Sequence, residues 1–157
     1  MIIINNTEKC TGCAACYNIC PVSCISMKES AEGFFYPKID IELCLECGLC
    51  RRTCPANDRV ISQSQSISIY ACMSLDDEIR FKSSSGGVFR LLADQIIKRG
   101  GIVFGVYLDD GFYAKHGWVD NKDDLDKLLK SKYVQSYIGN SYREAKEFLC
   151  AGRYVLF

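Results

Sequence analysis

The stretch "CTGCAACYNICP", from Cys10 to Pro21, places four cysteines within eleven residues and ends the run with a proline. The same pattern returns 34 residues later as "CLECGLCRRTCP", from Cys44 to Pro55. Both copies have the spacing Cys-x2-Cys-x2-Cys-x3-Cys-Pro. A small unit that repeats with fixed spacing is an architectural signal, because each copy is expected to fold in the same way.

The spacing of the cysteines favours iron–sulfur clusters. The chain has 11 cysteines, and an odd number cannot be fully paired in disulfides. A gap of two residues between three successive cysteines lets their sulfurs turn toward a common centre, as the corners of an iron–sulfur cube require. Zinc, the alternative, usually takes two separate cysteine pairs. We therefore expect two 4Fe–4S clusters rather than zinc sites or disulfides.

The last cysteine of each run is expected to point away from its own loop. In two-cluster ferredoxins this cysteine, followed by proline, binds the other cluster. The loops also carry small residues that let backbone N–H groups approach the sulfides. The predicted ligand sets are Cys10, Cys13, Cys16 and Cys54 for one cluster, and Cys44, Cys47, Cys50 and Cys20 for the other. This pattern resembles the bacterial 2×4Fe–4S ferredoxins over residues 1–61.

Three cysteines lie outside the two runs. Cys24 stands where ferredoxins often have a small apolar residue, while Cys72 and Cys150 fall on a predicted strand and a predicted helix. We interpret all three as core residues. His116, the single histidine, stands beside Trp118 on a predicted strand and is given no role. No nucleophile or acid–base pair stands out, so no catalytic residue is predicted.

The composition excludes several classes of partner. The 19 basic and 19 acidic residues cancel, so no net positive charge attracts nucleic acid or anionic lipid. The longest apolar runs are too short to cross a bilayer. The first ten residues, "MIIINNTEKC", lack the features of a secretory signal peptide. A cytoplasmic protein is the expectation.

The remainder of the chain predicts a partial α/β domain with a mixed sheet. We expect a ferredoxin-like domain over residues 1–61, with a hairpin between its cysteine runs. A linker near 56–66 would lead to an α/β domain over residues 67–157. The fold class expected for the chain is α+β. The elements expected after the linker are strands at 66–73, 102–108, 112–119 and 153–157 and helices within 86–101, 121–129 and 141–152. The first of these helices would bury Val88, Leu91, Leu92 and Ile96.

A serine- and glycine-rich stretch, "FKSSSGGVF" at residues 81–89, precedes the first long helix. Its backbone N–H groups and the positive end of the helix would suit an anion, with Lys82 as an additional cation. The alternative is an ordinary serine-rich helix cap. A second polar and aromatic loop, "KSKYVQSYIG" at residues 130–139, has the alternative of a simple surface connection.

These stretches, "RFKSSSGGVFRLLA", "GGIVFGVYLDD" and "LLKSKYVQSYIG", follow a duplicated cysteine module, and together they resemble the family of coenzyme F420 hydrogenase/dehydrogenase beta subunits. The resemblance implies 4Fe–4S clusters and FAD, a redox partner protein, and a small hydride acceptor such as F420. It also implies that the flavin contacts are Lys82, Ser83, Ser84, Ser85, Gly86, Gly87, Lys132, Tyr133, Gln135 and Ser136.

The resemblance predicts the electron-transfer portion of a flavin-dependent oxidoreductase. Members of the family continue past the strand that matches "RYVLF", so we expect this sequence to be a fragment of a longer protein. Two alternatives stay open. One is a ferredoxin-type electron carrier whose α/β domain docks a partner without catalysis of its own. The other is a regulatory or assembly protein that uses the clusters as an oxygen sensor.

Overall fold

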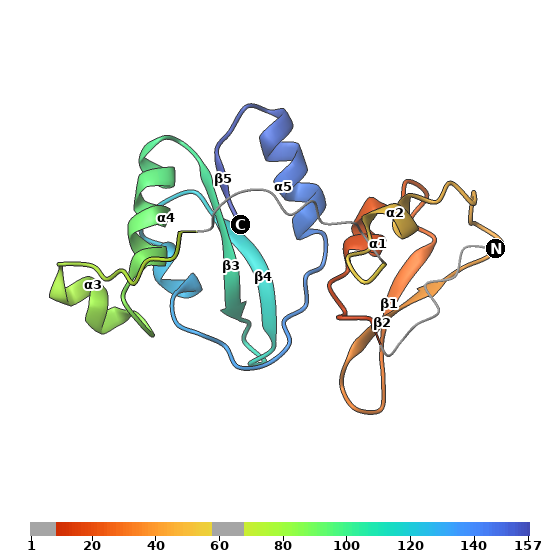
Figure 1. Ribbon diagram of the computed structural model, residues 1–157, viewed down its shortest axis with the longest axis horizontal. Coiled ribbons are helices and arrows are strands. Elements are labelled where there is room, and N and C mark those ends of the chain that lie inside the picture. Colours follow the sequence, from red (N-terminus) through yellow and green to blue (C-terminus); the bar gives the residue numbers. More distant parts are fainter. Residues whose placement is uncertain (1–8, 58–67) are drawn as a thin grey trace. The chain divides into compact units, whose positions relative to one another are not determined.

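The computed structural model describes residues 9–57 and 68–157 and divides into two units, Met1–Ser64 and Gln65–Phe157 (Figure 1). Most of the predicted linker at 56–66 lies outside the described residues. Within the described ranges, no helix combines the length and the apolar character needed to cross a membrane.

The first unit contains two short helices and a hairpin. Its elements are α1 (Ala15–Ile19), β1 (Ile25–Glu29), β2 (Phe35–Ile39) and α2 (Leu49–Thr53). The strands β1 and β2 pair in antiparallel fashion, which confirms the predicted hairpin between the cysteine runs.

The sequence repeat is also a repeat of backbone conformation. The residue before α1, Ala14, has φ 56°, and its counterpart before α2, Gly48, has φ 74°. Both lie in the left-handed region, which glycine adopts at no steric cost and alanine does not. The residues that end the helices also match: Cys20 has φ −67° and ψ 118°, and Cys54 has φ −68° and ψ 121°. Each run therefore turns sharply into one helical turn and leaves it in extended conformation at its last cysteine.

The second unit is a small sheet with helices. Its elements are α3 (Asp77–Lys82), α4 (Val88–Lys98), β3 (Ile102–Leu108), β4 (Ala114–Val119), the 3₁₀ helix η1 (Leu125–Leu128), α5 (Ser141–Cys150) and β5 (Val155–Leu156). The strand order is β4-β3-β5. Because β3 is antiparallel to β4 and parallel to β5, the sheet is mixed, as the sequence predicted.

The two faces of β3 bury different cores. Val103 packs with Ala93 of α4 and with Leu125 and Leu128 of η1, whereas its neighbours Ile102 and Phe104 pack against Ala145 of α5. This alternation follows from the period of two along a strand. Figure 1 shows the result, with α4 and α5 on opposite sides of the sheet.

Two expectations for the second unit were wrong. Residues 68–73, in the predicted first strand, form no strand; Ile69 is 90% exposed, so the alternating pattern has no partner strand and no core beneath it. The predicted buried face of α4 was wrong in part. Ile96 packs against the core as predicted, but the buried residue is Ala93, and Val88, Leu91 and Leu92 are 38%, 39% and 50% exposed.

The core position of Phe104 gives a test of this fold. Phe104 is 2% exposed, and its ring lies against those of Phe148 and Phe157. We expect Phe104→Ala to destabilise the second unit by about 3–5 kcal/mol, since the truncation removes buried contacts and leaves a cavity. The measurement is a urea titration followed by the fluorescence of Trp118, the single tryptophan of the chain, which lies on β4.

The matched control is Phe81→Ala, because Phe81 is 92% exposed and its truncation should change stability by no more than about 0.5 kcal/mol. Equal urea midpoints for the two variants would contradict the packing described here.

Candidate metal centres and a serine-lined pocket

The first unit has two cavities lined by cysteines. Cavity A is lined by Cys10, Cys13 and Cys16 of the first run and by Cys54 of the second run. Met27 of β1 and Pro37 of β2 complete one of its walls. The last cysteine of the second run therefore lies beside the loop of the first run.

Cavity B has the reciprocal arrangement. It is lined by Cys44, Cys47 and Cys50 of the second run and by Cys20 of the first run. One further cysteine, Cys24, also lines it. The eight cysteines that were predicted as ligands thus divide between the two cavities into the same two sets of four as in the prediction.

The backbone places N–H groups on the sulfurs at matching positions of the two runs. The N–H of Gly12 donates to Cys10 Sγ at 3.5 Å, and the N–H of Glu46 donates to Cys44 Sγ at 3.4 Å. Gly12 and Glu46 are counterparts in the repeat, and both have a left-handed backbone, with φ 67° and 51°. Donors of this kind support the negative charge of a thiolate, whether or not a cluster is bound.

Burial in both cavities disfavours the charged thiolate form of cysteine. In cavity A it raises the pKa of Cys16 to about 11, and the nearby Cys13 and Cys10 raise this pKa further. It also raises the pKa of Cys50. For Cys20, burial acts in the same direction, but hydrogen bonds from Cys24 and from the following backbone outweigh it and lower the pKa. Thiolates in such a place need a positive group to compensate them, and bound metal supplies one.

Two of the three remaining cysteines do not occupy the core positions that were predicted for them. Cys24 is buried, as expected, whereas Cys72 and Cys150 are exposed. Burial, followed by the proximity of Cys20 and Cys44, raises the pKa of Cys24 to about 12. That Cys24 faces the other cysteines of cavity B was not predicted, although its position four residues after Cys20 was the available signal.

The second unit contains a larger pocket, here called the serine pocket, with a volume of about 460 Å³. Its walls are the segment between α3 and α4 and the segment after η1, and the two touch where the N–H of Ser131 donates to Ser84 Oγ at 2.8 Å. The pocket-lining residues that had been predicted as flavin contacts are Ser83, Ser84, Ser85, Gly86, Gly87 and Lys132. Gly86 is needed where it stands, because a Cβ there would lie 2.4 Å from the carbonyl oxygen of Cys72.

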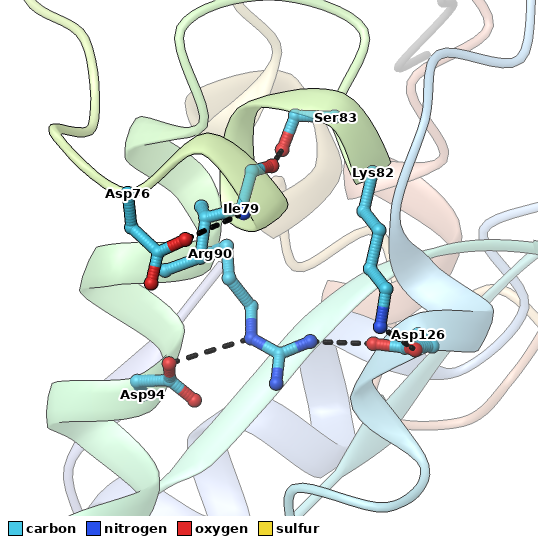
Figure 2. Close-up of polar contacts among 7 residues, drawn as sticks. All are labelled: Asp76, Ile79, Lys82, Ser83, Arg90, Asp94 and Asp126. Atoms are coloured by element: carbon cyan, nitrogen blue, oxygen red, sulfur yellow. Dashed lines mark hydrogen bonds and ion pairs between the residues drawn. The ribbon is translucent and has the colours of Figure 1, made fainter.

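Charged side chains hold these walls together (Figure 2). Arg90 of α4 bridges Asp94 of its own helix and Asp126 of η1. Lys82, at the end of α3, also points to Asp126, with its Nζ 3.9 Å from the carboxylate. At the start of α3, Asp76 caps the helix by accepting from the N–H of Ile79. The network ties α3, α4 and η1 into one frame around the pocket.

Several predicted flavin contacts do not line the serine pocket. Lys82 engages Asp126 instead, and Tyr133, Gln135 and Ser136 are also absent from its lining. Ser136 contacts His116, with 3.0 Å between the hydroxyl and Nδ1. Burial lowers the pKa of His116. Lys132, which does line the pocket, donates from its ammonium group to the carbonyl of Leu129, and burial lowers its pKa as well. The pocket also has walls that were not predicted, among them Gly105 of β3 and Leu128 of η1.

Known proteins match the first unit most clearly. Residues 9–57 match the family of 4Fe-4S dicluster domains. An uncharacterized ferredoxin of Methanocaldococcus jannaschii is 38% identical over 55 residues, which are 35% of this chain and 70% of that protein. An uncharacterized protein of Porphyra purpurea is 35% identical over 63 residues, 38% of this chain and 81% of that protein.

One relative extends through both units. It is a component of the F(420)H(2) dehydrogenase of Methanosarcina mazei and is 21% identical over 149 residues, which are 89% of this chain and 43% of that protein. The chain therefore spans less than half the length of this relative.

Spacing, backbone repeat, cavity lining and sequence similarity agree for the first unit. Its function is that of an iron–sulfur electron-transfer module. Through residues 9–57 the chain belongs to the family of 4Fe-4S dicluster ferredoxin domains.

Proposed function

We propose that the chain relays single electrons through two 4Fe–4S clusters, one held in cavity A and one in cavity B. The proposed ligands are Cys10, Cys13, Cys16 and Cys54 for the first, and Cys44, Cys47, Cys50 and Cys20 for the second. The observation that carries this proposal is the exchange of the last cysteine between the two runs, since each cavity is lined by three cysteines of one run and the fourth of the other. Two-cluster ferredoxins use the same exchange.

The contribution of the chain is to hold the cysteine sulfurs around each cavity and to support their charge. Bound clusters supply the one-electron chemistry. The N–H groups of Gly12 and Glu46 donate to the sulfurs of Cys10 and Cys44. Among the residues that the structure describes, no three metal-binding side chains lie close enough to share a single ion. A 4Fe–4S cluster contains four irons and four sulfides and is larger than a single ion. Its thiolate ligands therefore lie further apart than the ligands of one ion do.

For the second unit we propose FAD binding in the serine pocket. The volume of about 460 Å³ would accept a part of the cofactor, such as its phosphates or ribityl chain, and pockets for small molecules commonly have this size. Three serines, two glycines and Lys132 supply hydroxyl groups, backbone N–H groups and a cation for such a group. Lys82, Tyr133, Gln135 and Ser136 remain candidates for contact with other parts of the flavin.

Together the two proposals describe part of a flavin-dependent oxidoreductase. Clusters carry one electron at a time and a flavin carries two, so their combination can connect a one-electron partner to a hydride acceptor. The relative from Methanosarcina mazei is one component of an F(420)H(2) dehydrogenase. This supports redox partner subunits, and F420 or another small molecule as the hydride acceptor.

Anaerobic reconstitution with iron and sulfide tests the ligand sets. We expect the wild-type chain to bind roughly eight irons and eight sulfides and to give the EPR signals of two interacting clusters when reduced. Cys54→Ala should lower the iron content to roughly half, since it removes one ligand of the cluster in cavity A. The measurement is iron and sulfide analysis with low-temperature EPR of the same sample.

Cys150→Ala is the matched control because Cys150 is exposed and belongs to the second unit, and it should retain the wild-type iron content. Wild-type protein that stays free of iron, or a Cys54→Ala variant that keeps both signals, would contradict the proposed ligands.

An anaerobic FAD titration tests the serine pocket. We expect FAD to bind the reconstituted chain, and we expect Ser85→Asp to weaken this binding at least about tenfold, because it places a negative charge beside the phosphates. Quenching of flavin fluorescence gives the dissociation constant. Ser68→Asp introduces the same charge at an exposed residue outside the pocket lining and should bind as the wild type does. Intact clusters without any flavin binding would instead favour the electron carrier whose α/β domain docks a partner.

A further inference from the structure

Cavity B is lined by five cysteines, one more than a cluster with four irons uses. The extra one, Cys24, is 5% exposed and follows a tight turn. Cys20 begins this turn, and its carbonyl accepts from the N–H of Ser23 at 3.4 Å. Pro21 suits the second position of such a turn, and Ser23 has a left-handed backbone with φ 53°. The turn brings the chain back toward its start.

The turn places the two sulfurs of Cys20 and Cys24 together. Their Sγ atoms are 3.4 Å apart, within hydrogen-bonding distance for sulfur. The position of Cys24 is also fixed from its other side, because its carbonyl accepts from the N–H of Asp40 at 2.7 Å. This bond ties the start of β1 to the end of β2, so the contact between the sulfurs belongs to the ordered base of the hairpin.

The direction of this hydrogen bond follows from the proposed function, on which the inference rests. A cysteine that binds a metal does so as a thiolate and has no proton to donate. If Cys20 is a ligand, Cys24 must therefore be the donor. We propose that the thiol of Cys24 donates an S–H···S hydrogen bond to the ligand sulfur of Cys20 and thereby raises the reduction potential of the cluster in cavity B.

The sign of the effect comes from the charge that reduction adds. Reduction makes a cluster more negative, so a donor on a ligand sulfur stabilises the reduced state more than the oxidised state. Cavity A differs in this respect, since its lining within the described residues contains no cysteine besides its four predicted ligands. Two similar ligand sets thus have different surroundings, and Cys24 acts on only one of them.

Redox titration of the reconstituted chain, followed by EPR, tests the role of Cys24. We expect Cys24→Ala to retain the wild-type iron and sulfide content and to lower one of the two midpoint potentials. The full strength of one hydrogen bond corresponds to about a tenfold change in the equilibrium constant for one-electron reduction, which is about 59 mV. The expected shift is no larger than this, because the bond also stabilises the oxidised cluster. Cys24→Ser keeps a donor at this position and should restore most of the difference. Cys150→Ala should leave both potentials unchanged.

The outcomes separate this inference from the proposed function. Wild-type protein without clusters would overturn both. Wild-type clusters with two potentials that do not respond to Cys24→Ala would overturn the inference alone. So would equal shifts in Cys24→Ala and Cys24→Ser, because such shifts would come from altered packing and not from the donor. If Cys24→Ala loses a cluster that Cys20→Ala retains, Cys24 is the ligand itself and the proposed roles of the two residues are reversed.

Discussion

The structure of the first unit depends on a backbone constraint that occurs twice. A left-handed residue, Ala14 in one run and Gly48 in the other, turns the chain from a cysteine loop into a single helical turn. The short helix then carries the last cysteine of the run to the other cavity. The same backbone conformation thus accompanies the same exchange of the last cysteine in both runs.

The second unit is organised by a strand with two buried faces. Val103 of β3 contributes to the core under α4, and Ile102 and Phe104 contribute to the core under α5. The serine pocket lies at the edge of this arrangement, where β3, η1 and the segment before α4 meet. The ion pairs of Arg90 with Asp94 and Asp126 connect the same elements. The pocket is thus built on elements that are themselves packed or paired.

The grouping of the cysteines around two cavities could be predicted from sequence, because the spacing within each run and its repetition indicate it. Each loop needs only the positions of its own cysteines and small residues, and the repeat supplies the rest. In the second unit the hairpin of β3 and β4 and the helices α4 and α5 were also predictable from period and turn residues, whereas α3 was not predicted. Of the strand predicted at 66–73, residues 68–73 form no strand, since alternation alone does not supply a partner for Ile69. The buried face of α4 was predicted in part: Ile96 packs against the core as expected, but tertiary packing buries Ala93 instead of the more apolar Leu91 and Leu92. The contact between Cys20 and Cys24 depends on a turn whose left-handed residue is a serine, for which the sequence carries no strong signal.

The eight proposed ligands differ in their access to solvent. Cys16 and Cys20 are buried, whereas Cys47 is exposed. Thiolates that small oxidants can reach are the first to be oxidised. In the proposed arrangement, damage by air would therefore start at the loop that carries Cys47, and the centre in cavity A would outlast the centre in cavity B.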